Sequence, residues 1–203
     1  MQFRPLRIIQ KIYPSFIWSF SDEQEGVFLT FDDGPSPDVT PWVLDRLQAY
    51  GARATFFCIG KNVELFPDLF QEIKQRGHRV GNHSYSHVKG WGLDSDTYIR
   101  DVDMANDLIR TNLFRAPYAR ITPAQARLVN ERFYTIMWSV LSRDYNRSLS
   151  PQQCAANVLP YLDPGAIVVF HDSLKCERNM KYALEKTLDA IYEKGLICKP
   201  IIL

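Results

Sequence analysis

The chain has 203 residues, of which 46% are hydrophobic and 23% charged, and its 24 basic and 23 acidic side chains leave a net charge of +1. This composition is typical of a globular domain that buries roughly 70% of its unfolded surface. The near-neutral balance without a basic arm argues against nucleic acid as a partner. No stretch approaches the about 18 consecutive apolar residues that a membrane-spanning helix needs.

Residues 1–26 precede the first predicted strand and are expected to pack on the domain through five apolar residues: Ile8, Ile9, Ile12, Phe16 and Trp18. The alternative is peripheral membrane contact, in which lipid headgroups face the basic side chains Arg4, Arg7 and Lys11. Packing is favoured because Pro14 interrupts the segment. The interruption also leaves the apolar run too short for a signal peptide, so the expected location is the cytoplasm.

From residue 27 onward, short apolar runs alternate with helical patterns, which is typical of strands connected through helices in a parallel sheet. In chain order, the predicted strands cover 27–31, 54–59, 79–81, 113–115, 134–138, 166–170 and 197–202. The predicted helices cover 41–50, 66–76, 96–110, a segment opened by Thr122 and Pro123, a segment opened by Ser150 and Pro151, and 178–194.

About seven strands and six helices fit an α/β protein whose residues 27–203 form a single domain, a shortened or distorted (β/α) barrel. A complete eight-fold barrel usually needs about 250 residues, and an open doubly wound sheet is the alternative. Both folds place functional residues at the C-terminal ends of the strands.

Two adjacent carboxylates, Asp32 and Asp33, follow the first predicted strand directly. Neighbouring residues on a strand point to opposite sides, so both can serve one site only if the strand ends there. Gly34 and Pro35 indicate that it does. A solvated surface turn is the competing interpretation.

Histidines stand at two further strand ends. His83 and His87 are four residues apart, a spacing that puts both rings on one face of a helical turn, where they can bind one metal. His171 ends the strand at 166–170, whereas His78 precedes its strand and is expected to be structural. Two histidines and one carboxylate leave a metal position open for water, as in catalytic zinc sites. The second carboxylate then serves as a base and the third histidine as an acid, which predicts metal-assisted acyl hydrolysis.

These motifs and their order resemble the polysaccharide deacetylase family, carbohydrate esterase family 4, from about Val27 to the C-terminus. The resemblance implies a distorted (β/α)7 barrel that deacetylates chitin, peptidoglycan or acetylxylan. It also implies that Asp32 is the general base and that the metal ligands are Asp33, His83 and His87. His171 resembles the general acid.

Four further positions resemble supporting parts of the family's site. Arg115 matches the arginine that holds the base, and the backbone N–H of Tyr118 matches an oxyanion donor. Asp144 matches the carboxylate that orients the acid histidine, and Val169 the apolar wall of the acetyl pocket.

Three positions depart from the family pattern. Leu141 replaces the first aspartate of the fourth motif, Tyr145 replaces its tryptophan, and Ala119 follows Tyr118 where glycine is usual. The change at Tyr145 alters an acetyl-pocket wall or sugar platform, so we expect an effect on substrate preference. Two other aromatic residues, Trp42 and Trp91, are, like Tyr145, candidates for stacking on sugars, but core packing is favoured for all three.

The sequence therefore predicts a metal-dependent hydrolase that removes acetyl groups from N-acetylhexosamine in a glycan or a lipid-linked sugar. Zinc is the expected metal, with cobalt or nickel as alternatives. One competing hypothesis keeps the chemistry but changes the substrate to O-acetyl esters or a non-sugar amide. The other is a catalytically dead protein that only binds carbohydrate.

Overall fold

The protein is described here by a computed structural model, which covers the backbone from residue 7 to residue 203 and the side chains from residue 10. The strands are β1 (Gly26–Asp32), β2 (Thr55–Cys58), β3 (Arg79–Asn82), β4 (Leu113–Phe114), β5 (Tyr134–Thr135), β6 (Val140–Leu141), β7 (Ile167–His171) and β8 (Ile197–Cys198). The α-helices are α1 (Arg7–Ile12), α2 (Thr40–Ala49), α3 (Gly60–Leu65), α4 (Pro67–Gln75), α5 (Ser95–Ile109), α6 (Pro123–Asn130), α7 (Pro151–Ala156) and α8 (Glu177–Glu193). Two 3₁₀ turns, Pro117–Ala119 and Leu159–Tyr161, complete the elements.

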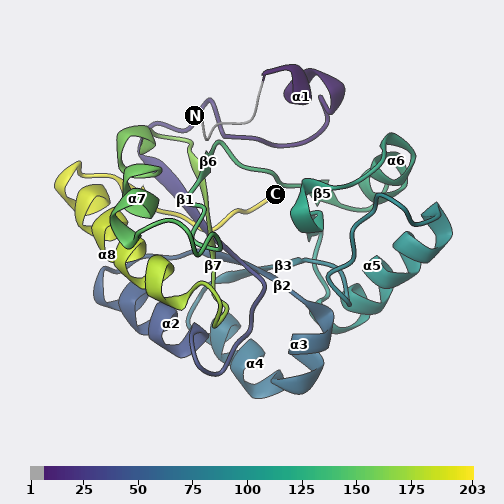
Figure 1. Cartoon of the computed structure of the whole chain (residues 1–203), viewed down its shortest axis with the longest axis horizontal. Coiled ribbons are helices and arrows are strands. Elements are labelled where there is room, and N and C mark those ends of the chain that lie inside the picture. The colour runs from purple at the N-terminus through teal and green to yellow at the C-terminus, as the bar shows by residue number, and fades with distance from the viewer. Residues whose placement is uncertain (1–6) are drawn as a thin grey trace.

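The strands form one parallel sheet in the order β5-β4-β3-β2-β1-β7-β6, and β8 pairs with the start of β1. The sheet is curled, with the helices wrapped around its outside (Figure 1). The predicted α/β fold with a distorted barrel is confirmed. Three short elements, α1, α3 and β6, were not predicted from the sequence.

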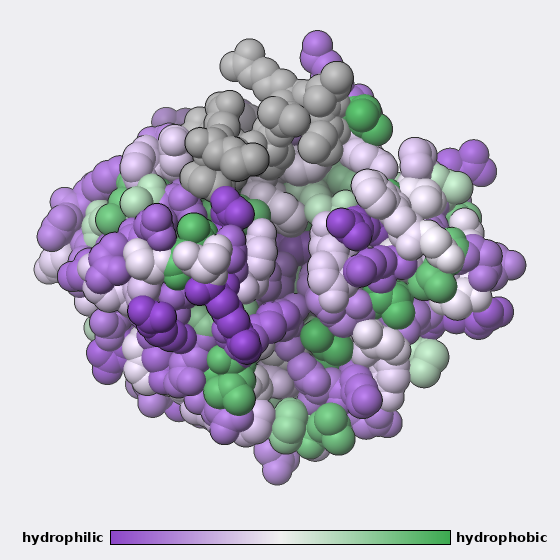
Figure 2. All heavy atoms as spheres, in the orientation of Figure 1, coloured by the Kyte–Doolittle hydropathy of each residue, from purple (hydrophilic) through white to green (hydrophobic). Residues whose placement is uncertain are grey.

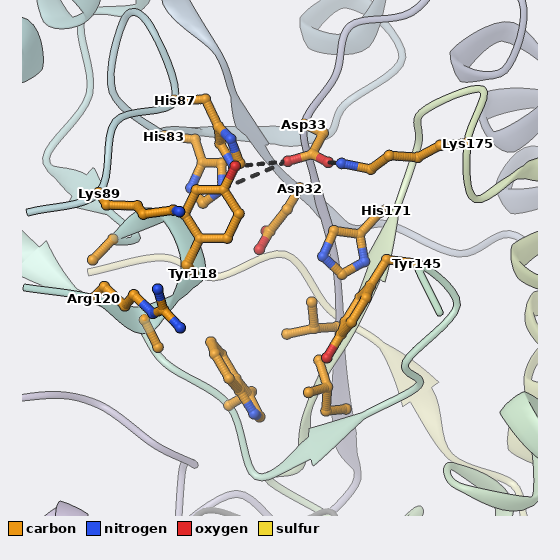
Figure 3. Close-up of a pocket in the computed structure, with 15 residues that line it drawn as sticks. Asp32, Asp33, His83, His87, Lys89, Tyr118, Arg120, Tyr145, His171 and Lys175 are labelled. Atoms are coloured by element: carbon orange, nitrogen blue, oxygen red, sulfur yellow. Dashed lines mark ion pairs between the residues drawn. The ribbon is translucent and has the colours of Figure 1, made fainter. Parts of the chain in front are cut away.

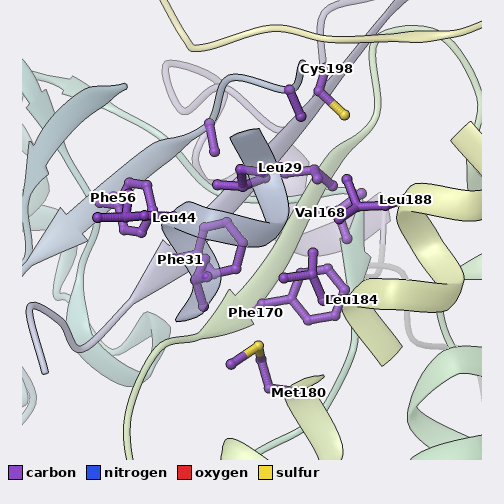
Figure 4. Packing of buried hydrophobic residues seen from close by; sticks show 14 of the residues in the cluster. Leu29, Phe31, Leu44, Phe56, Val168, Phe170, Met180, Leu184, Leu188 and Cys198 are labelled. Carbon is purple, nitrogen blue, oxygen red and sulfur yellow. The ribbon is translucent and has the colours of Figure 1, made fainter. Parts of the chain in front are cut away.

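Alternating side chains of β1 divide the core between the two faces of the sheet. Val27, Leu29 and Phe31 pack with α2, α8 and the neighbouring strands in the largest buried cluster (Figure 4). Phe28 points the other way, into a smaller cluster inside the curl with Phe57 and four other residues. This period of two is what a strand buried on both faces dictates.

The segment before β1 contacts the sheet near its two ends. Ile17 bridges to Ile136 just past β5, and Ser19 bridges to Ala166 just before β7. Phe16 is buried, but Ile12, which the sequence analysis placed in the packing, is 58% exposed. Arg4 and the side chains of Arg7, Ile8 and Ile9 lie outside the described residues. Within the part of the chain that the structure describes, no helix has the length and apolarity to cross a membrane.

Candidate active site

A cavity of about 510 Å³ opens where the C-terminal ends of the strands meet. The space-filling view shows it as a hollow bordered by hydrophilic side chains (Figure 2). Eight of the ten predicted site residues line it: Asp32, Asp33, His83, His87, Tyr118, Tyr145, Val169 and His171 (Figure 3). The other two, Arg115 and Asp144, are fully buried behind it. The structure therefore brings together residues that span almost 140 positions of the sequence.

Asp32 is the last residue of β1, and a buried arginine fixes its position. Arg115 donates from Nη1 to Asp32 Oδ1 at 2.7 Å and to Thr30 Oγ1 at 2.7 Å. Its other nitrogens donate to the carbonyls of Ile136 and Met137 at 3.0 and 2.9 Å. With its guanidinium hydrogen-bonded in this way, Arg115 holds the Asp32 carboxyl in one orientation.

Asp33 leaves the strand with φ 80, which turns its side chain towards the same cavity as Asp32. Its Oδ1 lies 3.2 Å from His87 Nε2 and 3.8 Å from His83 Nε2. Burial raises its pKa, but the hydrogen bond from His87 and the nearby His171 and His83 rings outweigh burial and hold the pKa well below its usual range. Asp33 is therefore a carboxylate at neutral pH.

His83 and His87 converge without a helix. Residues 83–89 form a loop, contrary to the helical turn predicted from the spacing, in which Ser84 and His87 adopt left-handed φ values of 59 and 55. Asp101 of α5 fixes the loop by accepting hydrogen bonds from the backbone N–H groups of Tyr85 and Ser86 at 2.8 and 3.1 Å. A contact with a distant helix thus overrides the local pattern.

The three donor atoms fit a divalent metal. Asp33, His83 and His87 present ligand atoms that all lie within 4.8 Å of one another. His83 Nδ1 donates to the carbonyl of Arg115 at 2.8 Å, so Nε2 carries the lone pair that faces Asp33. Burial lowers the pKa of His83 to about 4, which keeps the ring neutral and able to bind a metal.

His171, the last residue of β7, lies on the side of the two aspartates that faces away from His83 and His87 (Figure 3). Its Nδ1 lies 2.7 Å from Asp144 Oδ1, and its backbone N–H donates to Asp144 Oδ2 at 2.8 Å. Burial lowers its pKa, but the charge and hydrogen bond of Asp144 outweigh burial and raise the pKa to about 9. His171 is therefore an imidazolium at neutral pH, and it lines the cavity.

Comparison with known proteins agrees with this geometry. The family model for polysaccharide deacetylase matches residues 21–136. The chain belongs to the polysaccharide deacetylase family. It is 33% identical to a peptidoglycan-N-acetylglucosamine deacetylase of Bacillus cereus over 72% of this chain and 56% of that protein, so the chain spans just over half of that relative's length. A chitooligosaccharide deacetylase of Rhizobium leguminosarum bv. trifolii is 31% identical over 74% of this chain and 73% of its own.

A crystal structure gives the same answer for the fold. That structure is a peptidoglycan N-acetylglucosamine deacetylase in complex with an N-oxidanyl-benzamide, and it superposes on this chain with a TM-score of 0.88. The two chains are 27% identical, and the match covers 95% of this chain and 94% of the other. The family assignment and the carbohydrate-esterase keywords from the sequence are therefore confirmed.

The three positions where this chain departs from the family pattern all line the cavity. Tyr145 and Leu141 both line it, and the Tyr145 ring meets the His171 ring edge-on at 5.2 Å between centroids. Ala119 also lines it, with φ 54. Tyr145 is 42% exposed, contrary to the core packing expected for it.

The other two candidate stacking residues behave differently from each other. Trp42 packs against the large core cluster as expected. Trp91 is 58% exposed, which corrects the packing prediction, and its indole N–H donates to the carbonyl of Ile121 at 3.2 Å. His78 is buried outside the cavity, as expected for a structural residue, and accepts from the backbone N–H of Ala54.

Sequence reasoning missed five cavity residues, three of them cationic: Lys89, Arg120, Lys175, Ala116 and Trp138. Lys89 follows His87 by two residues, Arg120 follows Tyr118 by two, and Lys175 follows His171 by four. Their position in the sequence could have indicated the three cations, because residues that directly follow a motif share its loop and border the same cavity. Lys175 Nζ forms an ion pair with Asp33 Oδ2 at 2.8 Å.

Proposed function

We propose that the chain is a metal-dependent N-deacetylase that hydrolyses the acetamide of N-acetylhexosamine units in a glycan or lipid-linked sugar. One observation carries the proposal. The Asp33–His83–His87 cluster shares one cavity with a carboxylate held by Arg115 and a histidine held by Asp144, so a base and an acid border one metal position. Such an arrangement suits an amide, whose amine leaves only after it gains a proton.

Asp33, His83 and His87 would hold the metal, for which we propose zinc because two imidazole nitrogens and one carboxylate oxygen are typical of its catalytic sites. Cobalt and nickel are the alternatives. When bound, the metal supplies Lewis-acid polarisation of the acetyl carbonyl and makes water a stronger acid.

The chain's own residues complete the reaction. Asp32 takes a proton from the attacking water while the new carbon–oxygen bond forms, and Arg115 keeps the carboxylate aimed. His171 gives its proton to the departing nitrogen as the carbon–nitrogen bond breaks, so the products are acetate and a free amine. The backbone N–H of Tyr118 is the proposed oxyanion donor, while Val169 and Tyr145 form apolar walls beside the acetyl group.

Asp32→Asn tests this division of roles. The variant should keep its metal, because Asp32 is not among the three clustered ligands, and lose about 10²- to 10⁴-fold in kcat. Acetate release from an N-acetylglucosamine oligomer and metal content by elemental analysis give the two readouts. A variant that loses its metal would show that Asp32 is itself a ligand.

A substrate panel separates the deacetylase from the alternatives raised by the sequence. We expect acetate from N-acetylglucosamine oligomers and none after a chelator has removed the metal. Release from O-acetylated xylan alone would favour an esterase, and no release from any substrate by metal-loaded protein would favour a carbohydrate-binding protein.

A further inference from the structure

The cavity carries more positive charge than its chemistry uses. Besides the His171 imidazolium, which the chemistry uses, its lining includes three cations, Lys89, Arg120 and Lys175, and only two carboxylates, Asp32 and Asp33. Arg115 neutralises Asp32 from behind, and a metal would neutralise Asp33. The mouth of the site is therefore cationic in the apo protein and more strongly so with a metal bound.

Two of the three cations have no anionic partner. Lys175 pairs with Asp33, but neither Lys89 nor Arg120 forms an ion pair with any described residue. Both side chains instead lie against aromatic rings: Lys89 Nζ is 5.2 Å from the Tyr118 ring centroid, and the Arg120 guanidinium is 5.5 Å from the Trp91 ring centroid. These contacts hold the two charged groups without neutralising them.

The loops that carry Lys89 and Arg120 are fixed to each other. The backbone N–H of Gly90 donates to the carbonyl of Arg120 at 2.7 Å. Gln125, a fully buried residue of α6, donates to the carbonyls of Gly90 and Leu93 at 2.9 and 3.1 Å. Both cations therefore stand on a braced platform, on the Tyr118 side of the cavity and across it from His171 and Tyr145 (Figure 3).

We propose that this platform selects an anionic substrate: an acetylated hexosamine that carries a carboxylate or a phosphate close to its acetamide. The inference rests on the proposed function and narrows its substrate class. A neutral glycan offers only hydroxyl and amide groups. When such a sugar fills the cavity and displaces water, Lys89 and Arg120 are left without counter-charge. A carboxylate or phosphate supplies that charge, and guanidinium binds either of them through two parallel hydrogen bonds.

The first experiment compares substrates that differ in charge alone. A tetrasaccharide of alternating N-acetylglucosamine and N-acetylmuramic acid carries lactyl carboxylates, and its methyl ester is the neutral control of the same shape. Chitotetraose and chitobiosyl phosphate complete the panel. We expect wild type to show about tenfold higher kcat/KM on the carboxylate or the phosphate than on the neutral sugars at low salt. Whichever anion is preferred identifies the source of the charge.

The second experiment removes the cations. Lys89→Met combined with Arg120→Gln should bring the ratio of kcat/KM for acid to ester within about twofold, mainly by raising KM for the acid. Lys89→Arg and Arg120→Lys should retain the preference. The matched controls are Lys61→Gln and Arg127→Gln, which remove exposed cations outside this cavity.

The salt dependence of the substrate preference distinguishes charge recognition by Lys89 and Arg120 from a purely structural role, which salt would not affect. The preference of wild type should shrink as salt rises from about 0.01 to 1 M, where the Debye length falls from about 30 to 3 Å. Equal kcat/KM for acid and ester in wild type, or a preference that persists in the double variant, would overturn the inference. Loss of acetate release on every substrate by wild type would instead overturn the proposed function.

Discussion

Arg115 is a fully buried charge that side chains and backbone carbonyls hold together. Its guanidinium is satisfied by Asp32, Thr30 and two carbonyls, and it lies 4.1 Å from the Phe57 ring centroid. Charges are rarely buried fully unless they are paired in this way. The pairing links β1, β4 and the segment after β5, so Arg115 supports both the fold and the orientation of the base.

Replacing Arg115 with methionine tests this double role. The change leaves Asp32 buried without its counter-charge, and we expect a loss of about 3–5 kcal/mol in the free energy of unfolding. Urea denaturation measures it. Adding Asp32→Asn should recover part of the loss, because the uncompensated charge is then gone. A loss below about 1 kcal/mol would show that water already screens the pair.

Asp144 sets the protonation of His171, and Asp144→Asn should reveal it in the pH profile. His171 donates only when protonated, so activity should fall as pH rises through its pKa, which is raised to about 9. The charge of Asp33 contributes to the raised pKa of His171, so a metal bound to Asp33 shifts the falling limb of the pH profile to lower pH. In Asp144→Asn the falling limb should move to lower pH.

Two substrates sharpen that test. The amide needs a proton on its leaving amine, whereas an activated ester does not, so Asp144→Asn should reduce kcat/KM more on the amide. Equal losses on both, with an unmoved falling limb, would make Asp144 purely structural.

The raised pKa of His171 also stabilises the fold. Its contribution to the free energy of unfolding is full below pH ~6.5 and disappears as pH rises through about 9.

The sequence predicted the polar residues of the site because their types and spacing carry chemistry. It did not predict the backbone carbonyls of Ile136 and Met137 that satisfy Arg115, since a carbonyl leaves no signature in residue identity. It also missed Lys89 and Arg120, because an exposed cation in a loop resembles an ordinary surface charge until the fold places it at a cavity.

At the scale of elements, the turn after β1 decides how the two aspartates share one site. Gly34 lies against Asp172, a fully buried carboxyl whose pKa burial raises to about 8, and Thr40 donates to that carboxyl at 2.5 Å. A Cβ added at Gly34 would lie 2.1 Å from Asp172 Oδ2. Glycine is therefore required there for space.

Gly34→Ala should destabilise the protein by about 1–3 kcal/mol through overpacking and also reduce activity by displacing Asp33. Thermal unfolding and acetate release measure the two effects. Gly92→Ala is the control: it adds backbone strain, because Gly92 has a φ of 92, but its Cβ meets nothing within 4 Å, so it destabilises without displacing the site. Similar activity losses in the two variants would mean that the contact with Asp172 does not position the site.

Helix ends were predictable where short-range hydrogen bonds decide them. Thr122 caps α6 and Ser150 caps α7, each in a capping box with the glutamine three residues later. Elements decided by distant partners were not predictable. The loop at His83–His87 takes its shape from Asp101 of α5, and the two-residue strand β6 exists only because β7 pairs with it.

For the whole molecule, the packed core makes the fold independent of the metal. The large cluster combines residues from most of the sheet with the inner faces of α2, α4 and α8, and no metal ligand belongs to it. A chelator should therefore leave a folded, inactive protein whose melting temperature rises when metal is restored, because a ligand that binds only the native state stabilises it.

One measurement tests the central claim most directly: metal content and acetate release, followed in the same preparation on an N-acetylglucosamine oligomer. Wild type should hold about one metal ion per chain, lose activity with it on chelation and regain both on addition of zinc. His87→Ala should remain folded by circular dichroism but bind little metal and release no acetate. Full acetate release by metal-free wild type, or by His87→Ala without metal, would contradict the account.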